Sequence, residues 1–122
     1  MAEILVVDDV DDVREGIVAV LESAGHTITE AKDGRDAIAK LGQHRFDLVV
    51  TDIMMPEQDG TEVIMHLETL DPRPPVLAIS GGAPNVPAYM ALHLARLKAD
   101  ATLMKPFRNE ELKAKVDALL KG

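Results

Sequence analysis

Four short apolar runs, each followed at once by a polar residue, most constrain how this chain can fold. A continuous apolar run of this length is typical of a strand that is buried on both faces. Strands of that kind form parallel sheets that helices cover on both sides. The runs and the residues that follow them are Ile4–Val7 with Asp8 and Asp9, Leu48–Thr51 with Asp52, Val76–Ile79 with Ser80, and Ala101–Met104 with Lys105.

Strand-like and helix-like segments alternate five times along the chain, because a weaker strand pattern near the sheet edge adds to the four runs. Five such units predict a doubly wound, five-stranded parallel α/β sheet with five helices on both faces. We expect the flavodoxin-like strand order 2-1-3-4-5, which right-handed crossovers permit but periodicity does not fix. The expected strands are residues 3–8, 26–31, 46–51, 76–80 and 101–104, and the expected helices are residues 12–24, 33–41, 61–70, 87–98 and the segment after Asn109.

Local signals mark several helix ends. Asp12 followed by Glu15 reads as a capping box at the start of the first helix, and Gly25 is a natural stop after its end. Asn109 is expected to cap the last helix, since asparagine is favoured at that position.

Composition excludes several classes of protein. A chain of 122 residues is expected to form one domain over residues 1–122, with no effector domain. A net charge of −8 repels phosphate backbones, so nucleic acid is not an expected partner. The absence of cysteine excludes disulfides, and no apolar stretch is long enough to span a membrane. We therefore expect a cytoplasmic protein with no membrane partner.

Chemically active side chains are expected to meet at one edge of the sheet. In open parallel sheets, ligands bind beyond the carboxyl ends of the strands, at a topological switch point. Three carboxylates, one hydroxyl and one ammonium group follow the predicted strands, at Asp8, Asp9, Asp52, Ser80 and Lys105. Such a set suits a divalent cation and a phosphoryl group.

These residues carry a family resemblance. The string Val6-Val7-Asp8-Asp9, the segment from Asp52 through Pro56 to Gly60, the pair Ser80-Gly81 and the triplet Lys105-Pro106-Phe107 occur in this order at predicted strand ends. With these motifs the whole chain resembles the receiver domain of two-component response regulators. Each motif alone is weak, but their combination is specific.

The resemblance implies a role for each residue of the set. Asp52 would be the phosphoryl acceptor, since a carboxylate can attack phosphorus and form an acyl phosphate. Mg²⁺ is the implied cofactor, with Asp9 and Asp52 as direct ligands and Asp8 acting mostly through water. The remaining roles are a third metal ligand at the backbone carbonyl of Met54, contacts to phosphoryl oxygens from Lys105 and Ser80, and a cis peptide bond between Lys105 and Pro106.

The chain departs from the family at its switch. Receivers often carry an aromatic residue three positions before the lysine, and here that position is Thr102. The segment between Ser80 and Lys105 is also longer than typical, with the extra length in residues 81–87. The aromatic part of the family's switch is therefore absent from this chain.

The resemblance also implies partners. A histidine kinase or a histidine phosphotransfer protein would supply the phosphoryl group, and a downstream protein of unknown identity would read it. Expected docking residues for the donor are Val10, Val13, Arg14, Ile17, Pro106 and Phe107. The output face would include Tyr89, His93 and Arg96.

Two other functions remain open. A phosphatase with an aspartate nucleophile would want a second aspartate two residues after the first, where this chain has Met54. A receiver fold that binds partners without phosphorylation would not need the complete set from Asp8 to Lys105. A phosphoryl adduct from acetyl phosphate with Mg²⁺ that is lost in Asp52→Asn would favour the switch over the phosphorylation-independent module. Turnover of a phosphomonoester would favour the phosphatase.

Overall fold

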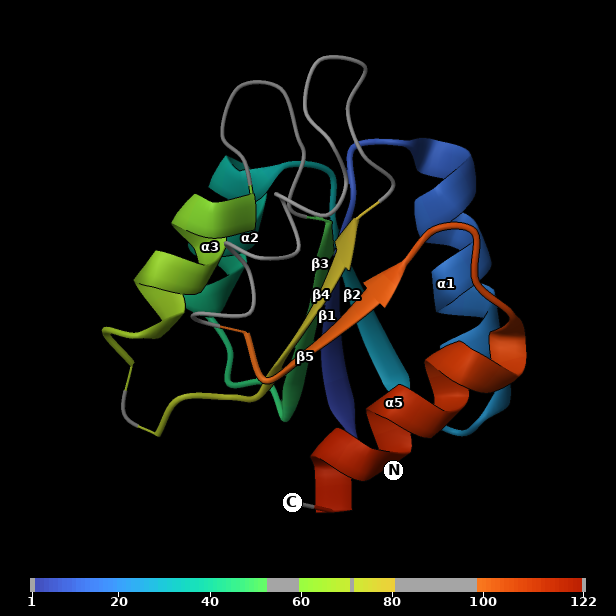
Figure 1. The fold of residues 1–122 in the computed structure, drawn as a ribbon. Helices are drawn as coiled ribbons and strands as arrows, with labels where there is room; N and C mark the ends of the chain where they lie inside the picture. Colours follow the sequence, from blue (N-terminus) through green and yellow to red (C-terminus); the bar gives the residue numbers. More distant parts are fainter. Residues whose placement is uncertain (1, 53–59, 71, 81–98, 122) are drawn as a thin grey trace.

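The computed structural model describes residues 2–52, 60–70, 72–80 and 99–121. It describes the backbone alone at Gly60, Thr61, Glu62, Ile64 and Ser80. Five parallel strands form one sheet in the order β2-β1-β3-β4-β5, which confirms the predicted fold class and strand order (Figure 1). The strands are β1 Glu3–Val7, β2 Thr27–Ala31, β3 Leu48–Asp52, β4 Val76–Ser80 and β5 Ala101–Met104. The described helices are α1 Asp11–Ser23, α2 Gly34–Leu41, α3 Gly60–Leu67 and α5 Asn109–Lys121. The helix expected at residues 87–98 lies outside the described residues.

The sheet is buried on both faces, as its continuous apolar runs predict. Alternate residues of the central strands point to opposite sides, so Leu5 and Val7 pack with α2 and α3 while Ile4 and Val6 pack with α1 and α5. Figure 1 shows these two helix pairs on opposite sides of the sheet. The weaker pattern of β2 reflects its place at the sheet edge, where Thr27 and Glu30 are exposed.

The start of α1 differs from the predicted capping box. The residue that precedes the helix is Val10, whose extended backbone offers no side-chain cap, and Asp12 already lies inside the helix. The prediction was wrong because the helix begins one residue earlier, and the amide of Arg14, which an Asp12 cap would serve, donates to the carbonyl of Val10 at 2.9 Å. Val10 N itself donates to Asp8 Oδ1 at 2.9 Å. The turn before α1 is thus held by the side chain of Asp8, the residue that follows β1.

The other two helix-end predictions have different outcomes. Gly25 has φ of 95° and ends α1 as predicted, with the amides of Gly25 and His26 donating to carbonyls of the last turn. Asn109 is the first residue of α5 rather than its cap, so that prediction was wrong. The Glu111 carboxylate instead accepts the N–H of Arg108 at 3.1 Å, which satisfies an amide just before the helix.

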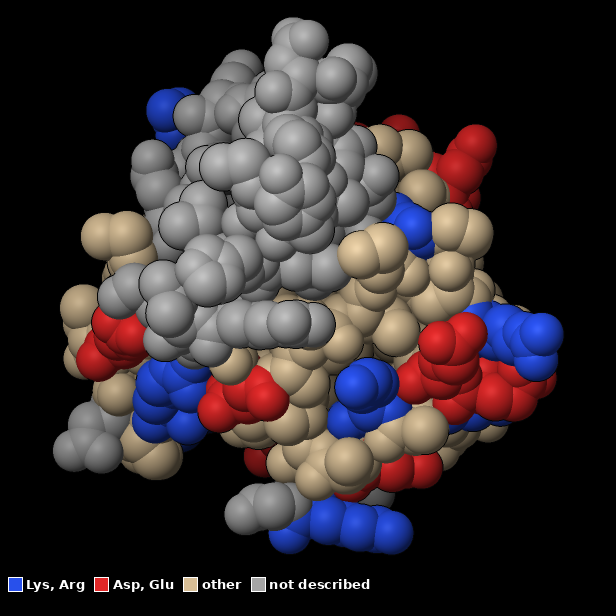
Figure 2. Space-filling model, in the orientation of Figure 1, with Lys and Arg blue, Asp and Glu red and all other residues tan. Residues whose placement is uncertain are grey.

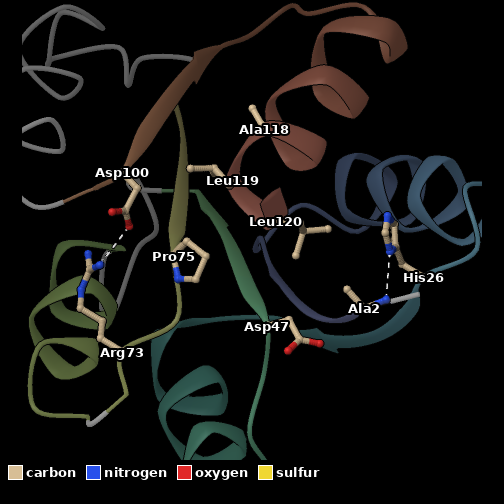
Figure 3. A pocket seen from close by; sticks show the side chains of 9 residues that line it. All are labelled: Ala2, His26, Asp47, Arg73, Pro75, Asp100, Ala118, Leu119 and Leu120. Carbon is tan, nitrogen blue, oxygen red and sulfur yellow. Dashed lines mark hydrogen bonds and ion pairs between the residues drawn. The ribbon is translucent and has the colours of Figure 1, made fainter. Parts of the chain in front are cut away.

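Polar side chains secure the amino-terminal end of the sheet, around a cavity of about 820 Å³ (Figure 3). Asp47 Oδ2 accepts the N–H of Glu3 at 2.8 Å, and His26 Nδ1 accepts the N–H of Ala2 at 3.2 Å. Asp100 Oδ2 accepts from both Arg73 Nη1 at 2.9 Å and the N–H of Val76 at 2.8 Å. These contacts hold the first residues of β1 and β4 to neighbouring chain segments.

The double role of Asp100 predicts a stability effect. We expect Asp100→Ala to lower the free energy of unfolding by about 1–2 kcal/mol, because two donors lose their acceptor at a partly exposed site. Asp100→Asn keeps an acceptor oxygen and should lose less. Urea unfolding with an unchanged m value measures both variants. Equal losses in the two variants would contradict this account.

Charges are mixed on the surface. On the face drawn in Figure 2, Lys and Arg side chains lie among Asp and Glu side chains over the described residues. Among the described residues, no helix combines the length and apolar character needed to cross a bilayer.

Candidate functional site

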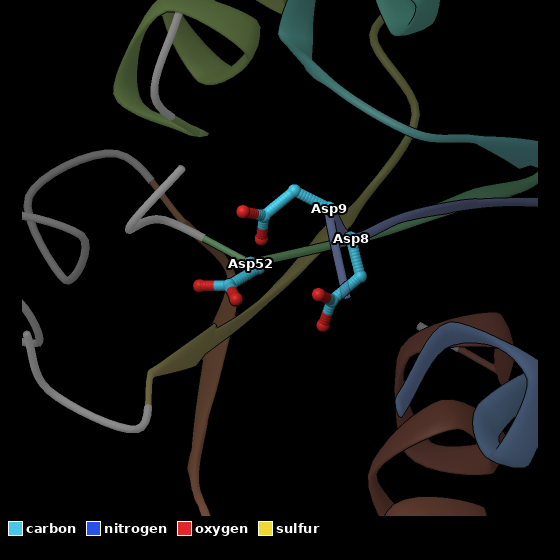
Figure 4. Close-up of side chains that lie close together, drawn as sticks. All are labelled: Asp8, Asp9 and Asp52. Carbon is cyan, nitrogen blue, oxygen red and sulfur yellow. The ribbon is translucent and has the colours of Figure 1, made fainter. Parts of the chain in front are cut away.

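Three aspartates meet at the carboxyl end of the two central strands (Figure 4). Asp8 and Asp9 follow β1 and Asp52 ends β3, and these neighbouring strands pair with Val7 opposite Thr51. One carboxylate oxygen from each aspartate lies within 4.8 Å of the other two. Asp8 is 1% exposed and Asp52 is 5% exposed, so two of the three acids are almost fully buried.

Lys105 brings a positive charge to this cluster. Its Nζ donates to Asp52 Oδ2 at 3.0 Å and to Asp8 Oδ2 at 3.2 Å, and its side chain is 21% exposed. The residue follows β5, which is separated from β3 by β4. The Lys105–Pro106 peptide bond is cis, the conformation that the family resemblance implies.

The carboxylates keep Lys105 charged. Burial lowers the pKa of Lys105, but the attraction and hydrogen bonds of Asp52 and Asp8 outweigh it, so this pKa lies above its ordinary value. A raised pKa in the folded state stabilises the fold at every pH below the ordinary value of 10.5. That stabilisation is lost only as the pH rises through the raised pKa, so Lys105 is an ammonium group at neutral pH.

The cluster fits a divalent cation. Three carboxylates and one ammonium group leave a formal charge of two negative units, which a divalent cation would balance. All the clustered ligand atoms are carboxylate oxygens, the hard ligands that Mg²⁺ prefers. Among the described residues, no buried side-chain N or O atom lacks a hydrogen-bond partner, so the framework is internally satisfied.

The turn that carries Asp8 and Asp9 is held by several contacts. Asp8 N donates to the carbonyl of Ala31 at 3.2 Å, and Asp8 Oδ1 accepts from Val10. Arg14 Nη1 donates to the carbonyl oxygen of Asp8 at 2.8 Å. The spacing of residues did not reveal this contact, although Arg14 lies one helical turn from Asp11, with which it pairs.

The other predicted site residues fall in three places. Ser80 ends β4 opposite Met104 in the strand register, and Thr102 is half-buried on β5 opposite Ala78. The predicted metal ligand at Met54 lies outside the described residues, as do the predicted output residues Tyr89, His93 and Arg96.

The predicted docking residues lie along α1 and the loop before α5. Val10 is 47% exposed, whereas Ile17 is 4% exposed and belongs mainly to the core. Val13, Ile17 and Phe107 line a groove between α1 and α5 with a volume of about 390 Å³. Pro106 is exposed beside this groove, while Arg14 is 13% exposed and bonded to its own chain.

Comparison with known proteins places this geometry in a family. The model of the response regulator receiver domain matches residues 4–117. The response regulator MprA of Mycolicibacterium vanbaalenii is 38% identical over 97% of this chain, and the receiver protein CpdR of Brucella abortus is 34% identical over 98% of both chains. The chain spans about half the length of MprA and of several other curated relatives.

Solved structures agree with these matches. The Francisella response regulator 1452 receiver domain superposes with a TM-score of 0.85 at 28% identity, covering 99% of this chain and 98% of that one. TrrA of Thermotoga maritima, solved in complex with Mg²⁺ and BeF, superposes with a TM-score of 0.85 at 31% identity, covering 98% and 99%. The chain therefore belongs to the receiver domain family of two-component response regulators, whose members are phosphoacceptor switches rather than turnover enzymes.

Proposed function

We propose that this receiver accepts a phosphoryl group on Asp52 from a histidine kinase or a histidine phosphotransfer protein, in a Mg²⁺-dependent reaction. It then acts as a phosphorylation-controlled interaction switch or as a phosphorelay intermediate. The observation that carries the proposal is the meeting of the Asp8, Asp9 and Asp52 carboxylates with the Lys105 ammonium group at one strand edge. The related TrrA structure with Mg²⁺ and BeF supports the same assignment.

The transfer step uses Asp52 as nucleophile. A carboxylate oxygen of Asp52 attacks the phosphorus of a donor phosphohistidine that is protonated on its other ring nitrogen. A new O–P bond forms, and the N–P bond breaks with its electron pair returning to that ring, which leaves as neutral imidazole. Burial keeps water away from the acceptor, since Asp52 is 5% exposed. The result is an acyl phosphate on this chain and a neutral histidine on the donor.

The other residues organise charge around this step. Asp9 and Asp52 would hold Mg²⁺ directly and Asp8 mostly through water, with the Met54 carbonyl as a further proposed ligand. The bound ion would neutralise charge on the transferring oxygens. Lys105 already donates a hydrogen bond to the acceptor carboxylate. Its ammonium group can therefore donate to a phosphoryl oxygen once the phosphoryl group is attached to Asp52. The hydroxyl of Ser80, at the end of the adjacent strand β4, is the proposed donor to another phosphoryl oxygen.

The phosphoryl donor is proposed to dock beside α1. The groove between α1 and α5 is lined by Val13, Ile17 and Phe107, and Val10 is exposed close to the aspartates. An apolar patch next to the acceptor suits a helix of a phosphodonor that must bring its histidine to Asp52. Arg14 and Pro106 are further proposed docking residues for the donor. Tyr89, His93 and Arg96 remain the proposed output residues.

Phosphotransfer profiling tests the choice of donor. Histidine kinases and phosphotransfer proteins from the cell that encodes this chain are phosphorylated, purified and mixed with it at short reaction times. We expect rapid transfer of label from one or a few donors, and slow transfer from the rest. Label that moves onward to a second phosphotransfer protein would identify a phosphorelay intermediate. The absence of transfer from every donor would count against the proposed function.

A further inference from the structure

The guanidinium group of Arg14 joins three acceptors around the turn that follows β1. Nη1 donates to the main-chain oxygen of Asp8 at 2.8 Å, Nη2 to Asp11 Oδ1 at 2.7 Å, and Nε to Glu30 Oε1 at 3.0 Å. The Arg14 side chain is 13% exposed, although Asp11 is 76% exposed and Glu30 is 46% exposed. Pairs with exposed carboxylates contribute little to stability, so the contact to the main-chain oxygen of Asp8 is what distinguishes this arrangement.

The main-chain contact has a geometric consequence at the metal site. The Asp8 carbonyl belongs to the planar peptide unit that joins Asp8 to Asp9. A hydrogen bond to its oxygen fixes the rotation of that plane, and with it the direction in which the Asp9 side chain leaves the backbone. The main-chain N–H of Arg14 also donates to the carbonyl of Val10 at 2.9 Å. Residue 14 therefore contacts the turn on both sides of Asp9, and the contact on the Asp8 side depends on the arginine side chain.

Glu30, the strand residue to which Arg14 is hydrogen-bonded, is itself held in place. Glu30 lies on β2 opposite Val6 of β1, and its main-chain oxygen accepts a hydrogen bond from Lys40 of α2. Burial opposes the charge of Arg14, but the hydrogen bonds and attraction of Asp11 and Glu30 outweigh it, and the pKa of Arg14 lies above its ordinary value. The guanidinium group is thus a permanent cation, and it connects the turn to a strand that lies outside the acidic cluster.

We propose that Arg14 is a positioning residue for the metal site, which acts by holding the Asp8–Asp9 peptide and uses Glu30 as its fixed point. The inference rests on the proposed function, because it concerns the Mg²⁺ that Asp9 would bind. A positioning role and a purely electrostatic role of Arg14 predict opposite changes in Mg²⁺ affinity when Arg14 is removed. Removing a nearby positive charge should strengthen the binding of a cation, whereas releasing the Asp9 turn should weaken it.

The test measures Mg²⁺ affinity by calorimetric titration, without a phosphodonor. We expect Arg14→Ala to weaken Mg²⁺ binding about 10-fold, as outer contacts to metal ligands typically do. Arg14→Lys keeps the charge but lacks the planar fork that spans three acceptors, so it should behave more like Arg14→Ala than like the native chain. Arg35→Ala, which removes an exposed arginine of α2, is the matched control and should leave the affinity nearly unchanged.

A second pair of variants covers the case in which Arg14→Ala does not fold. Glu30→Ala and Glu30→Gln remove the same charge, but glutamine keeps an acceptor oxygen for Arg14 Nε. We expect Glu30→Ala to bind Mg²⁺ several-fold more weakly than Glu30→Gln. Equal affinities in this pair would overturn the inference.

A kinetic readout separates positioning from general loss of structure. With acetyl phosphate, the Mg²⁺ concentration for half-maximal phosphorylation should rise about 10-fold in Arg14→Ala, while the rate at saturating Mg²⁺ changes less. Unchanged or tighter Mg²⁺ binding in Arg14→Ala would overturn the role of Arg14 and leave the proposed function intact. A native chain that neither binds Mg²⁺ nor takes a phosphoryl group would overturn both.

Discussion

Asp52→Asn is expected to abolish phosphorylation of this chain by acetyl phosphate in Mg²⁺ buffer. An amide oxygen is a far weaker nucleophile than a carboxylate oxygen and cannot form a stable acyl phosphate. The variant should still fold, because an asparagine oxygen can accept the hydrogen bond that Lys105 Nζ now donates to Asp52 Oδ2. Intact-protein mass spectrometry measures the fraction of chains that carry one added phosphoryl group.

The matched control is Asp47→Asn at the opposite end of the sheet. Asp47 accepts the N–H of Glu3 and lies outside the acidic cluster, so this variant should be phosphorylated like the native chain. Chelation of Mg²⁺ should stop the reaction in both. An adduct of equal extent in Asp52→Asn would identify a different acceptor. A native chain that takes no phosphoryl group would favour a module that binds partners without phosphorylation.

The fold was readable from the sequence because its strands are unusually uniform. Leu48, Val49 and Val50 are buried on both faces of the sheet, so every residue of the run is apolar and the strand stands out. Right-handed crossovers then leave few strand orders, and the expected one is found. The edge strand β2 gave a weaker signal because Thr27 and Glu30 face solvent.

The start of α1 was less predictable because several neighbouring aspartates have a residue type that is favoured at helix caps. Asp12 has the right residue type and spacing, but the amide of Arg14, which an Asp12 cap would serve, already donates to the carbonyl of Val10. The helix therefore begins at Asp11, with Val10 before it. A sequence pattern gives the candidates for a cap, and the path of the preceding strand selects among them.

The residues of the site also differ in how far the sequence predicted them. Asp8, Asp9, Asp52 and Lys105 were predictable because each follows a strand, and parallel topology brings those strand ends together. The hydrogen bond between Arg14 and Glu30 was not predictable, because 16 positions separate the two residues and no motif connects them. Such a contact depends on how α1 packs against β2. Hydrophobic periodicity predicts each element but not how the two pack together.

Lys105→Met is expected to lower the free energy of unfolding in metal-free buffer by about 3 kcal/mol. The variant keeps the unbranched apolar part of the side chain but removes the ammonium group that lies 3.0 Å from Asp52 and 3.2 Å from Asp8. Those carboxylates are almost fully buried, and breaking a buried ion pair leaves their charge uncompensated. Chemical denaturation at neutral pH, with a chelator present, measures the loss.

Mg²⁺ should restore much of that lost stability, because a divalent cation among the three carboxylates can replace the missing positive charge. The increase in unfolding free energy on adding Mg²⁺ should thus be larger in Lys105→Met than in the native chain. Lys113→Met, which removes an exposed lysine of α5, should change neither the stability nor the response to Mg²⁺. If Lys105→Met matched Lys113→Met in both measurements, the ammonium group would not be what balances the acidic cluster. A larger response to Mg²⁺ in Lys105→Met alone would mean that lysine and cation act on the same carboxylates, so that the metal site and the ion pair are one electrostatic unit.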